Sequence, residues 1–239
     1  MFFSFFRFAA AQTFDFYEAQ SLKKVPTVVY VHGGAWISGN KEQYKKMAQA
    51  LTQKNLCVAV MDYHLAPAGQ HPKPIEDLQT VISKIKKVKS SKCDVKKIFL
   101  VGHSAGAHTI AFWSTRFQDP SVKGLIGIEG IYDLPHLSRI WPSYKEAFIN
   151  AEFGANSKLA LASPTRLKIK TKVPWLIFHS AKDELVDSAQ STDFYQHLKA
   201  EGQTAEYVEI KAASHFGIID SLQHEDSPVR TKLLLFTHQ

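Results

Sequence analysis

Cysteine is scarce in this sequence, whose 239 residues include only Cys57 and Cys93. Two cysteines do not make the disulfide framework of a small secreted domain, and no cysteine or histidine cluster has metal-ligand spacing. Both cysteines lie in or beside segments that are typical of strands, where we expect small buried thiols. Free thiols of this kind favour a cytoplasmic location.

Long apolar runs are also missing, and after the amino-terminal segment no stretch approaches the length of a membrane-spanning helix. Residues 1–11 are apolar and end in alanines, like a signal peptide. However, Arg7 lies inside this run and not before it, and the run is short. We expect the segment to cover an edge of the core, with a targeting role as the alternative.

Basic residues are not gathered with aromatic residues into one motif, although the formal net charge is +7. The lysines are spread over segments with helical spacing, such as residues 41–46 and 84–89. We therefore expect a solvated basic surface and no nucleic-acid or membrane partner, with a weak preference for small anions left open. Internal repeats and low-complexity segments are absent, and the sequence gives no basis for an oligomeric state.

Short apolar runs alternate with helical patterns along the chain. Buried strands are predicted at residues 27–31, 56–61, 96–101, 122–128, 173–179 and 205–211. Helices are predicted at residues 41–54, 75–88, 107–113 and 193–200. This alternation predicts one α/β domain over residues 1–239, a three-layer sandwich with a mostly parallel sheet of about six strands. An aromatic-rich insert at residues 135–172 is expected to lie above the carboxyl ends of the strands, where it could cover a pocket.

A G-x-S-x-G motif is the strongest chemical signal in the chain. It occupies residues 102–106, after the apolar run 98–101 and before the helical run 107–113. A strand, this turn and a helix together expose a serine hydroxyl on a strained elbow, so we predict Ser104 as a nucleophile. Gly102 and Gly106 fit this reading because side chains there would collide where strand and helix approach. A merely structural turn is the alternative.

An oxyanion hole is predicted upstream, where an H-G-G-x-W segment follows the first strand. Its residues are His32, Gly33, Gly34, Ala35 and Trp36. Glycines at the end of a strand let backbone N–H groups face a ligand, so Gly33 or Gly34 is expected to act with the N–H of Ala105. We expect Trp36 to pack beside this loop as a core residue. An ordinary glycine turn is the alternative for the segment.

The acid and the base are assigned by their positions along the chain. Asp183 follows the strand at 173–179, which gives the order serine, acid, histidine. Glu184 and Asp187 are rival acids, and Asp187 could instead cap the next helix. His215 lies in the loop after the last strand, where the base is expected. His179, His197, His224 and His238 lie elsewhere in the pattern.

Taken together, these motifs resemble the α/β-hydrolase superfamily over nearly the whole chain. The first strand has only 26 residues before it, so the opening antiparallel hairpin of larger members is expected to be absent or reduced. The H-G-G-x-W form, the segments at 129–134 and 179–185, and the compact amino terminus most resemble kynurenine formamidases (arylformamidases), especially the short fungal type.

The resemblance implies hydrolysis of N-formyl-L-kynurenine to L-kynurenine and formate, a step of tryptophan breakdown, through a formyl-serine. Ser104, His215 and Asp183 would be the catalytic residues, and no metal or organic cofactor is expected. A carboxylesterase acting on small acyl esters with the same triad is the alternative. A hydrolase-fold binding protein without turnover is a more distant one.

Overall fold

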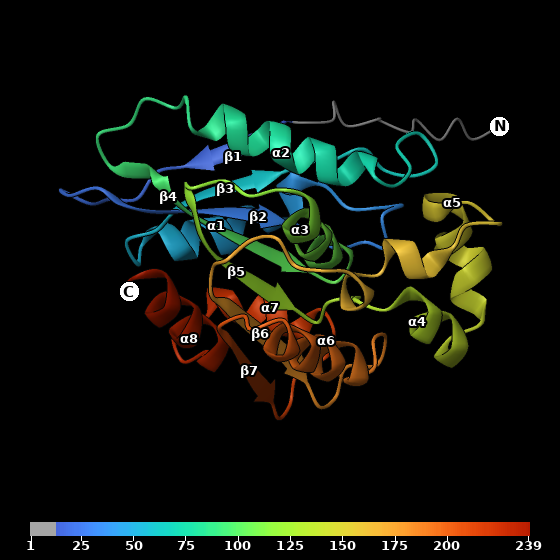
Figure 1. The fold of residues 1–239 in the computed structure, drawn as a ribbon. Coiled ribbons are helices and arrows are strands. Elements are labelled where there is room, and N and C mark those ends of the chain that lie inside the picture. The colour runs from blue at the N-terminus through green and yellow to red at the C-terminus, as the bar shows by residue number, and fades with distance from the viewer. Residues whose placement is uncertain (1–12) are drawn as a thin grey trace, which may run out of the picture.

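The centre of the molecule is a seven-stranded sheet with the strand order β1-β3-β2-β4-β5-β6-β7 (Figure 1). The computed structural model describes residues 13–239, so the segment expected to cover a core edge lies outside the described residues. The strands are β1 (Phe14–Tyr17), β2 (Val25–Val31), β3 (Cys57–Met61), β4 (Cys93–His103), β5 (Val122–Ile128), β6 (Trp175–Ser180) and β7 (Ala205–Ile210). Strands β2 to β7 pair in parallel, and β1 runs antiparallel to β3.

The six predicted apolar runs all form strands, and the mostly parallel sheet is confirmed. The four residues of β1 add an edge strand that the apolar pattern does not indicate, because each of them is only half buried. The register of β1 places Phe14 beside Met61 and Tyr17 beside Val58. The expected reduction of the amino-terminal hairpin therefore takes the form of this one short strand within residues 13–24.

Helices cover both faces of the sheet, which confirms the three layers. The larger helices are α1 (Lys45–Thr52), α2 (Lys73–Ile85), α3 (Ala105–Arg116), α6 (Ala189–Ala200) and α8 (Pro228–Thr237). Leu78 of α2, Trp113 of α3 and Phe194 of α6 belong to one apolar cluster. Met47 of α1 and Leu233 of α8 belong to the cluster on the other face, together with Ile218 of the short helix α7 (Gly217–Asp220).

Short helices make up most of the insert at residues 135–172, which lies beyond the carboxyl ends of the strands (Figure 1). They are α4 (Leu134–Ile140), the π-helix η2 (Lys145–Ile149), α5 (Asn150–Phe153) and the 3-10 helices η3 (Leu159–Ala162) and η4 (Pro164–Arg166). The 3-10 helices η1 (Lys41–Tyr44) and η5 (Ser221–Gln223) lie outside it. An apolar cluster joins Leu137 and Phe148 of the insert to Trp36 and Ala105. The insert therefore meets the loop after β2 and the start of α3 beside the predicted serine elbow.

The expectation of two free thiols is wrong, because Cys57 and Cys93 form a disulfide. Cys57 aligns with Thr27 and Cys93 with Val25, so both cysteines begin strands that flank β2. Their Cα atoms lie 5.7 Å apart, although 36 residues separate them in the sequence. That separation gives no local signal of the pairing, and the argument for a cytoplasmic location from free thiols loses its basis.

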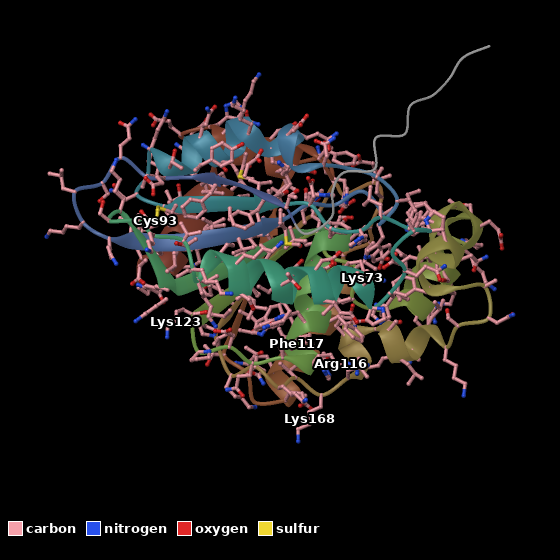
Figure 2. All side chains as sticks on the ribbon, turned by 90° about the horizontal axis from the view of Figure 1, so that it is seen from above. Lys73, Cys93, Arg116, Phe117, Lys123 and Lys168 are labelled. Atoms are coloured by element: carbon pink, nitrogen blue, oxygen red, sulfur yellow. A yellow bond between two sulfur atoms is a disulfide. The ribbon has the colours of Figure 1, made fainter. Side chains whose placement is uncertain are left out.

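Basic side chains lie on more than one part of the surface. Lys73, Lys123 and Lys168 lie apart from one another in Figure 2, which also shows Cys93 toward the left of the view. Within residues 13–239 no helix has both the length and the apolar character needed to cross a membrane.

Candidate active site

Ser104 lies at a sharp turn between β4 and α3. Its backbone has φ 54° and ψ −118°, a left-handed conformation that side chains rarely adopt. A Cβ atom on Gly106 would lie 2.1 Å from the Val31 carbonyl oxygen, and one on Gly102 would lie 2.4 Å from the Gly106 oxygen. Both glycines are therefore required by close packing, as the motif predicts. Strain of this kind persists only where the surrounding structure imposes it.

The predicted oxyanion loop lies directly against this turn. A Cβ atom added to Gly33 would come within 3.1 Å of Ser104 Cβ. Gly34 has φ 112°, and Ser38 N donates to its carbonyl oxygen at 3.0 Å, which closes the loop on itself. Ala105 is the first residue of α3, so its N–H belongs to the helix terminus that attracts negative charge. The structure thus brings Gly33, Ala105 and Ser104 together.

His32 and Trp36 fix the two ends of this loop. His32 Nδ1 donates to the Gly33 carbonyl oxygen at 2.6 Å, and Tyr63 Oη donates to the His32 carbonyl oxygen at 3.1 Å. Burial lowers the pKa of His32, which keeps the ring neutral and leaves Nδ1 as the donor. Trp36 is fully buried and contacts the His108 ring edge-on at 5.1 Å. It is a core residue, as the sequence predicts.

Asp183 and His215 are paired through a short hydrogen bond, in which His215 Nδ1 donates to Asp183 Oδ2 at 2.8 Å. The other carboxylate oxygen of Asp183 accepts from the backbone N–H groups of Leu185 and Val186 at 2.8 and 2.9 Å. Burial acts to raise the pKa of Asp183, but the bond and charge of His215 and these N–H groups hold it below its ordinary value. Asp183 is therefore an ionised partner for an imidazole.

The two rival acids lie in other contacts. Glu184 Oε2 accepts from the backbone N–H of His215 at 3.1 Å, so it holds the loop and not the ring. Asp187 Oδ1 contacts His136 Nε2 at 2.8 Å. Asp187 is also not the N-cap of α6, because Ser188 occupies that position. Asp183 is the only one of the three candidates whose side chain bonds to the His215 ring.

No hydrogen bond joins Ser104 Oγ to the His215 ring among residues 13–239. Catalytic hydrogen bonds are often long in an unliganded enzyme and tighten when substrate binds. His103, the neighbour of Ser104, donates from Nε2 to the His215 carbonyl oxygen at 2.9 Å and so holds the two segments together. When the His215 ring is neutral, the bond from Nδ1 to Asp183 places its one proton on Nδ1 and leaves Nε2 free to accept, which is the tautomer that a general base needs.

The model of the BD-FAE family matches residues 14–198, a range that includes Ser104 and Asp183 but not His215. The chain belongs to the BD-FAE family of α/β hydrolases. This BD-FAE hydrolase is similar to the kynurenine formamidase of Salmo salar, with 32% identity over 88% of this chain and 72% of that protein. It is 29% identical to the kynurenine formamidase of Danio rerio, over 95% of this chain and 78% of that protein. The resemblance to kynurenine formamidases is thereby confirmed.

A solved structure shows the same fold. The acetyl ester-xyloside bifunctional hydrolase from Caldicellulosiruptor lactoaceticus superposes with a TM-score of 0.77 at 19% identity. The match covers 94% of this chain and 87% of that one. The BD-FAE hydrolase therefore has the α/β-hydrolase fold expected from its motifs.

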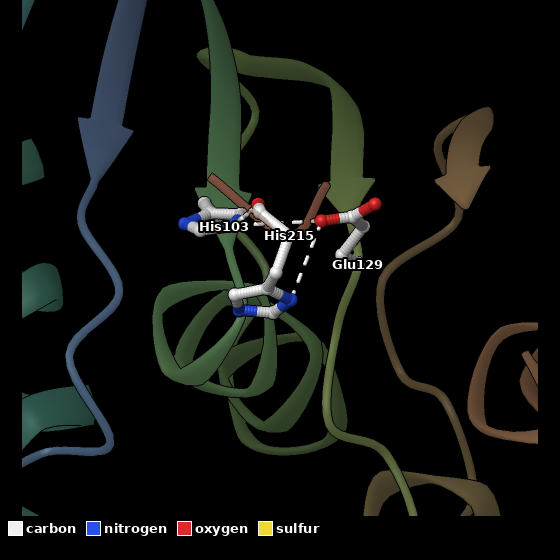
Figure 3. A group of neighbouring side chains, drawn as sticks. All are labelled: His103, Glu129 and His215. Carbon is white, nitrogen blue, oxygen red and sulfur yellow. Dashed lines mark hydrogen bonds and ion pairs between the residues drawn. The ribbon is translucent and has the colours of Figure 1, made fainter. Parts of the chain in front are cut away.

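His103 and Glu129 are site residues of the BD-FAE hydrolase to which the motifs assign no role. Both are fully buried beside His215 (Figure 3). Burial, and then the nearby His215, lower the pKa of His103 to about 3, so its ring is neutral. Potential ligand atoms of His103, Glu129 and His215 lie within 4.8 Å of one another, a separation that could suit a metal ion. However, His103 Nε2 and His215 Nδ1 both donate protons to oxygen atoms, so a metal would have to displace both hydrogen bonds.

A cavity and an aromatic side chain of the BD-FAE hydrolase lie near this centre, although neither Ser104 nor His215 lines the cavity. A cavity of about 360 Å³ is lined by Gly33, Gly34, His103, Phe216 and Asp220, among others. On the insert side, Tyr144 Oη donates to the Leu185 carbonyl oxygen at 3.2 Å, in the loop that carries Asp183. These contacts link the insert and the predicted oxyanion loop to the same centre.

Proposed function

We propose that this hydrolase cleaves N-formyl-L-kynurenine to L-kynurenine and formate. The observation that carries the proposal is the similarity to two kynurenine formamidases over most of both chains, combined with the Asp183–His215 pair beside the strained Ser104. The reaction belongs to tryptophan breakdown and, as proposed here, uses no metal or organic cofactor. The substrate is then the one small-molecule partner of the site.

The proposed mechanism proceeds in two halves. His215 Nε2 takes the proton of Ser104 Oγ as this oxygen attacks the formyl carbon. The N–H groups of Ala105 and of Gly33 or Gly34 stabilise the oxyanion that develops. The C–N bond then breaks, and His215 returns the proton to the departing arylamine. Water, deprotonated by His215, attacks the formyl-serine and releases formate, and Ser104 recovers its proton.

We place the departing group in the cavity beside the oxyanion loop, which is lined by Gly33 and Phe216 and not by Ser104 or His215 themselves. Its volume of about 360 Å³ lies within the usual range for small-molecule sites. Phe216, which follows His215, is 55% exposed and presents a ring at this cavity. The exposed carboxylate of Asp220 also lines it and could bind the α-ammonium group of the amino-acid tail.

The first test compares kcat/KM for N-formyl-L-kynurenine and for p-nitrophenyl acetate, in the wild type and in Ser104→Ala. We expect the formamide to be preferred by orders of magnitude, and the variant to lose about 10⁶-fold in turnover on both substrates. A chain that cleaves the ester but leaves the formamide untouched would be a small-acyl carboxylesterase. A wild-type chain that cleaves neither and does not react with a fluorophosphonate would be a binding protein.

A second arm of this test addresses the cavity. Asp220→Asn should raise KM for N-formyl-L-kynurenine about tenfold, because one exposed charge contact is lost, and should leave ester hydrolysis unchanged. Asp226→Asn is the matched control, since Asp226 is also exposed but does not line the cavity. Equal effects of the two variants would place the amino-acid tail elsewhere.

A further inference from the structure

Glu129 is a second carboxyl group at the His215 ring. It follows the last residue of β5, has φ 47° and is fully buried. Its Oε2 atom lies 3.3 Å from His215 Nδ1 and 3.8 Å from His103 Nε2 (Figure 3). Its Oε1 atom accepts from the Ser180 N–H at 3.3 Å, which fixes the orientation of the carboxyl group. His215 Nδ1 therefore lies 2.8 Å from a carboxyl oxygen of Asp183 and 3.3 Å from one of Glu129.

The two carboxyl groups have different surroundings. Asp183 accepts two backbone N–H bonds as well as the His215 bond, all of which favour its ionised form. Glu129 Oε2 has no hydrogen-bond donor among residues 13–239. Burial, and next the charge of Asp183, raise the pKa of Glu129 to about 10. At neutral pH the site thus holds one carboxylate and one carboxylic acid, because two charges this close are costly.

The titratable groups around Glu129 come from three directions. They are His103 at the end of β4, Asp183 and Glu184 in the loop after β6, and His215 after β7. Of the two carboxylates, Asp183 exerts the larger effect. Removal of the Asp183 charge should therefore release Glu129 to ionise nearer neutral pH.

We propose that Glu129 is a reserve acid for His215, a positioning residue that can replace Asp183 as the ionised partner of Nδ1. In the wild type it remains a neutral carboxylic acid beside the Asp183–His215 pair and adds no second negative charge. When Asp183 is neutralised, Glu129 loses its proton to solvent and accepts the Nδ1 hydrogen across the present 3.3 Å. The proposal rests on the proposed function only in that Ser104 and His215 act as nucleophile and base.

The test is a double-mutant cycle of Asp183→Asn and Glu129→Gln, with p-nitrophenyl acetate hydrolysis and fluorophosphonate labelling of Ser104 as readouts. Asparagine at 183 keeps an oxygen that can accept from Leu185 and Val186, so the turn should survive. We expect Glu129→Gln to cost less than about tenfold in kcat/KM in the wild type and about a hundredfold in the Asp183→Asn background. Equal factors in both backgrounds would show that Glu129 has only a structural role.

The pH profile gives an independent readout. The residual activity of Asp183→Asn should include a rise with pH that accompanies proton loss from Glu129, and the double variant should lack this component of the pH profile. A residual activity that has the same pH profile with and without Glu129 would overturn the proposal. If Glu129→Gln does not fold, a residual activity of Asp183→Asn that does not rise with pH would overturn it equally.

The matched control is Glu152→Gln, which makes the same change at another fully buried glutamate. Both carboxyl oxygens of Glu152 lack hydrogen-bond partners among the described residues, and Glu152 is on α5 in the insert. We expect it to change activity by the same factor in both backgrounds. Because neither readout uses N-formyl-L-kynurenine, a chain that ignores this substrate would fail the proposed function and still test the role of Glu129.

Discussion

The backbone of Ser104 is strained, because the sharp turn between β4 and α3 imposes a positive φ on a residue that has a Cβ atom. With φ 54° and ψ −118°, this residue occupies a region that glycine enters freely and serine does not. Such a conformation costs about 1–3 kcal/mol and is tolerated at functional sites. The nucleophile position is therefore a place where stability and activity oppose each other.

We predict that Ser104→Gly raises the free energy of unfolding by about 1 kcal/mol while it abolishes turnover. The gain should appear in chemical denaturation, with activity measured on p-nitrophenyl acetate. Ser104→Ala is the control, because alanine removes the hydroxyl but keeps the strained Cβ. It should lose activity without the gain in stability. Equal stability of the two variants would mean that the backbone angles are not strained in solution.

The sequence predicts much of the site because catalytic order and glycine spacing are local signals. Gly33 lies against Ser104, and Asp183 pairs with His215, as the motifs predict. Glu129 has no such signal, since its importance comes from the packing of three separate loops around one imidazole. Its position directly after a strand follows from the sequence, but its distance from His215 does not.

At the scale of elements, local pattern predicts the strands better than it predicts their partners. The predicted strand at 122–128 is β5, with the same bounds. The predicted helix at 75–88 is α2, which begins at Lys73 and ends at Ile85. The edge strand β1 and the Cys57–Cys93 disulfide both depend on residues far apart in sequence. Neither has a local signature, so neither follows from periodicity.

The disulfide should stabilise the amino-terminal ends of β3 and β4 without affecting catalysis. It closes a loop of 36 residues, for which about 2–4 kcal/mol of stabilisation is typical. Its cysteines begin their strands, whereas Ser104 follows the opposite end of β4. We predict that the Cys57→Ala/Cys93→Ala double variant loses this free energy of unfolding in urea and keeps kcat/KM at 25 °C. A matching loss of activity in fully folded protein would contradict the prediction.

At the scale of the whole molecule, buried ionisable groups give stability a dependence on pH. Burial lowers the pKa of His71 to about 3, of His103 to about 3 and of His108 to about 4. Burial raises the pKa of Glu129 to about 10 and of Glu152 to about 9. Each group binds protons differently in the folded and unfolded chain, so each contributes a slope to the free energy of unfolding.

As pH changes, the buried histidines and the buried glutamic acids change the free energy of unfolding in opposite directions. The histidines contribute stability that is present above pH 6.5, their ordinary pKa, and is lost as pH falls toward 3 to 4. The glutamic acids contribute stability that is present below pH 4.5, their ordinary pKa, and is lost as pH rises toward 9 to 10. Between pH 4.5 and 6.5, a rise in pH increases stability through the histidines and decreases it through the glutamic acids. Below pH 4.5 the histidines alone among these five groups change the stability, and above pH 6.5 the glutamic acids alone do so.

We therefore predict that Tm is highest between about pH 4.5 and 6.5 and falls on both sides. The Glu152→Gln variant isolates the contribution of Glu152 to this pH dependence. It removes an ionisation that is available only to the unfolded chain at alkaline pH. This variant should match the wild type near pH 4.5 and exceed it at pH 8 by several degrees, since about 1 kcal/mol shifts Tm by about 2–4 °C in a chain of this size. Calorimetry across this range measures the difference. A difference between the two proteins that is the same at every pH would show that Glu152 does not change its protonation on unfolding.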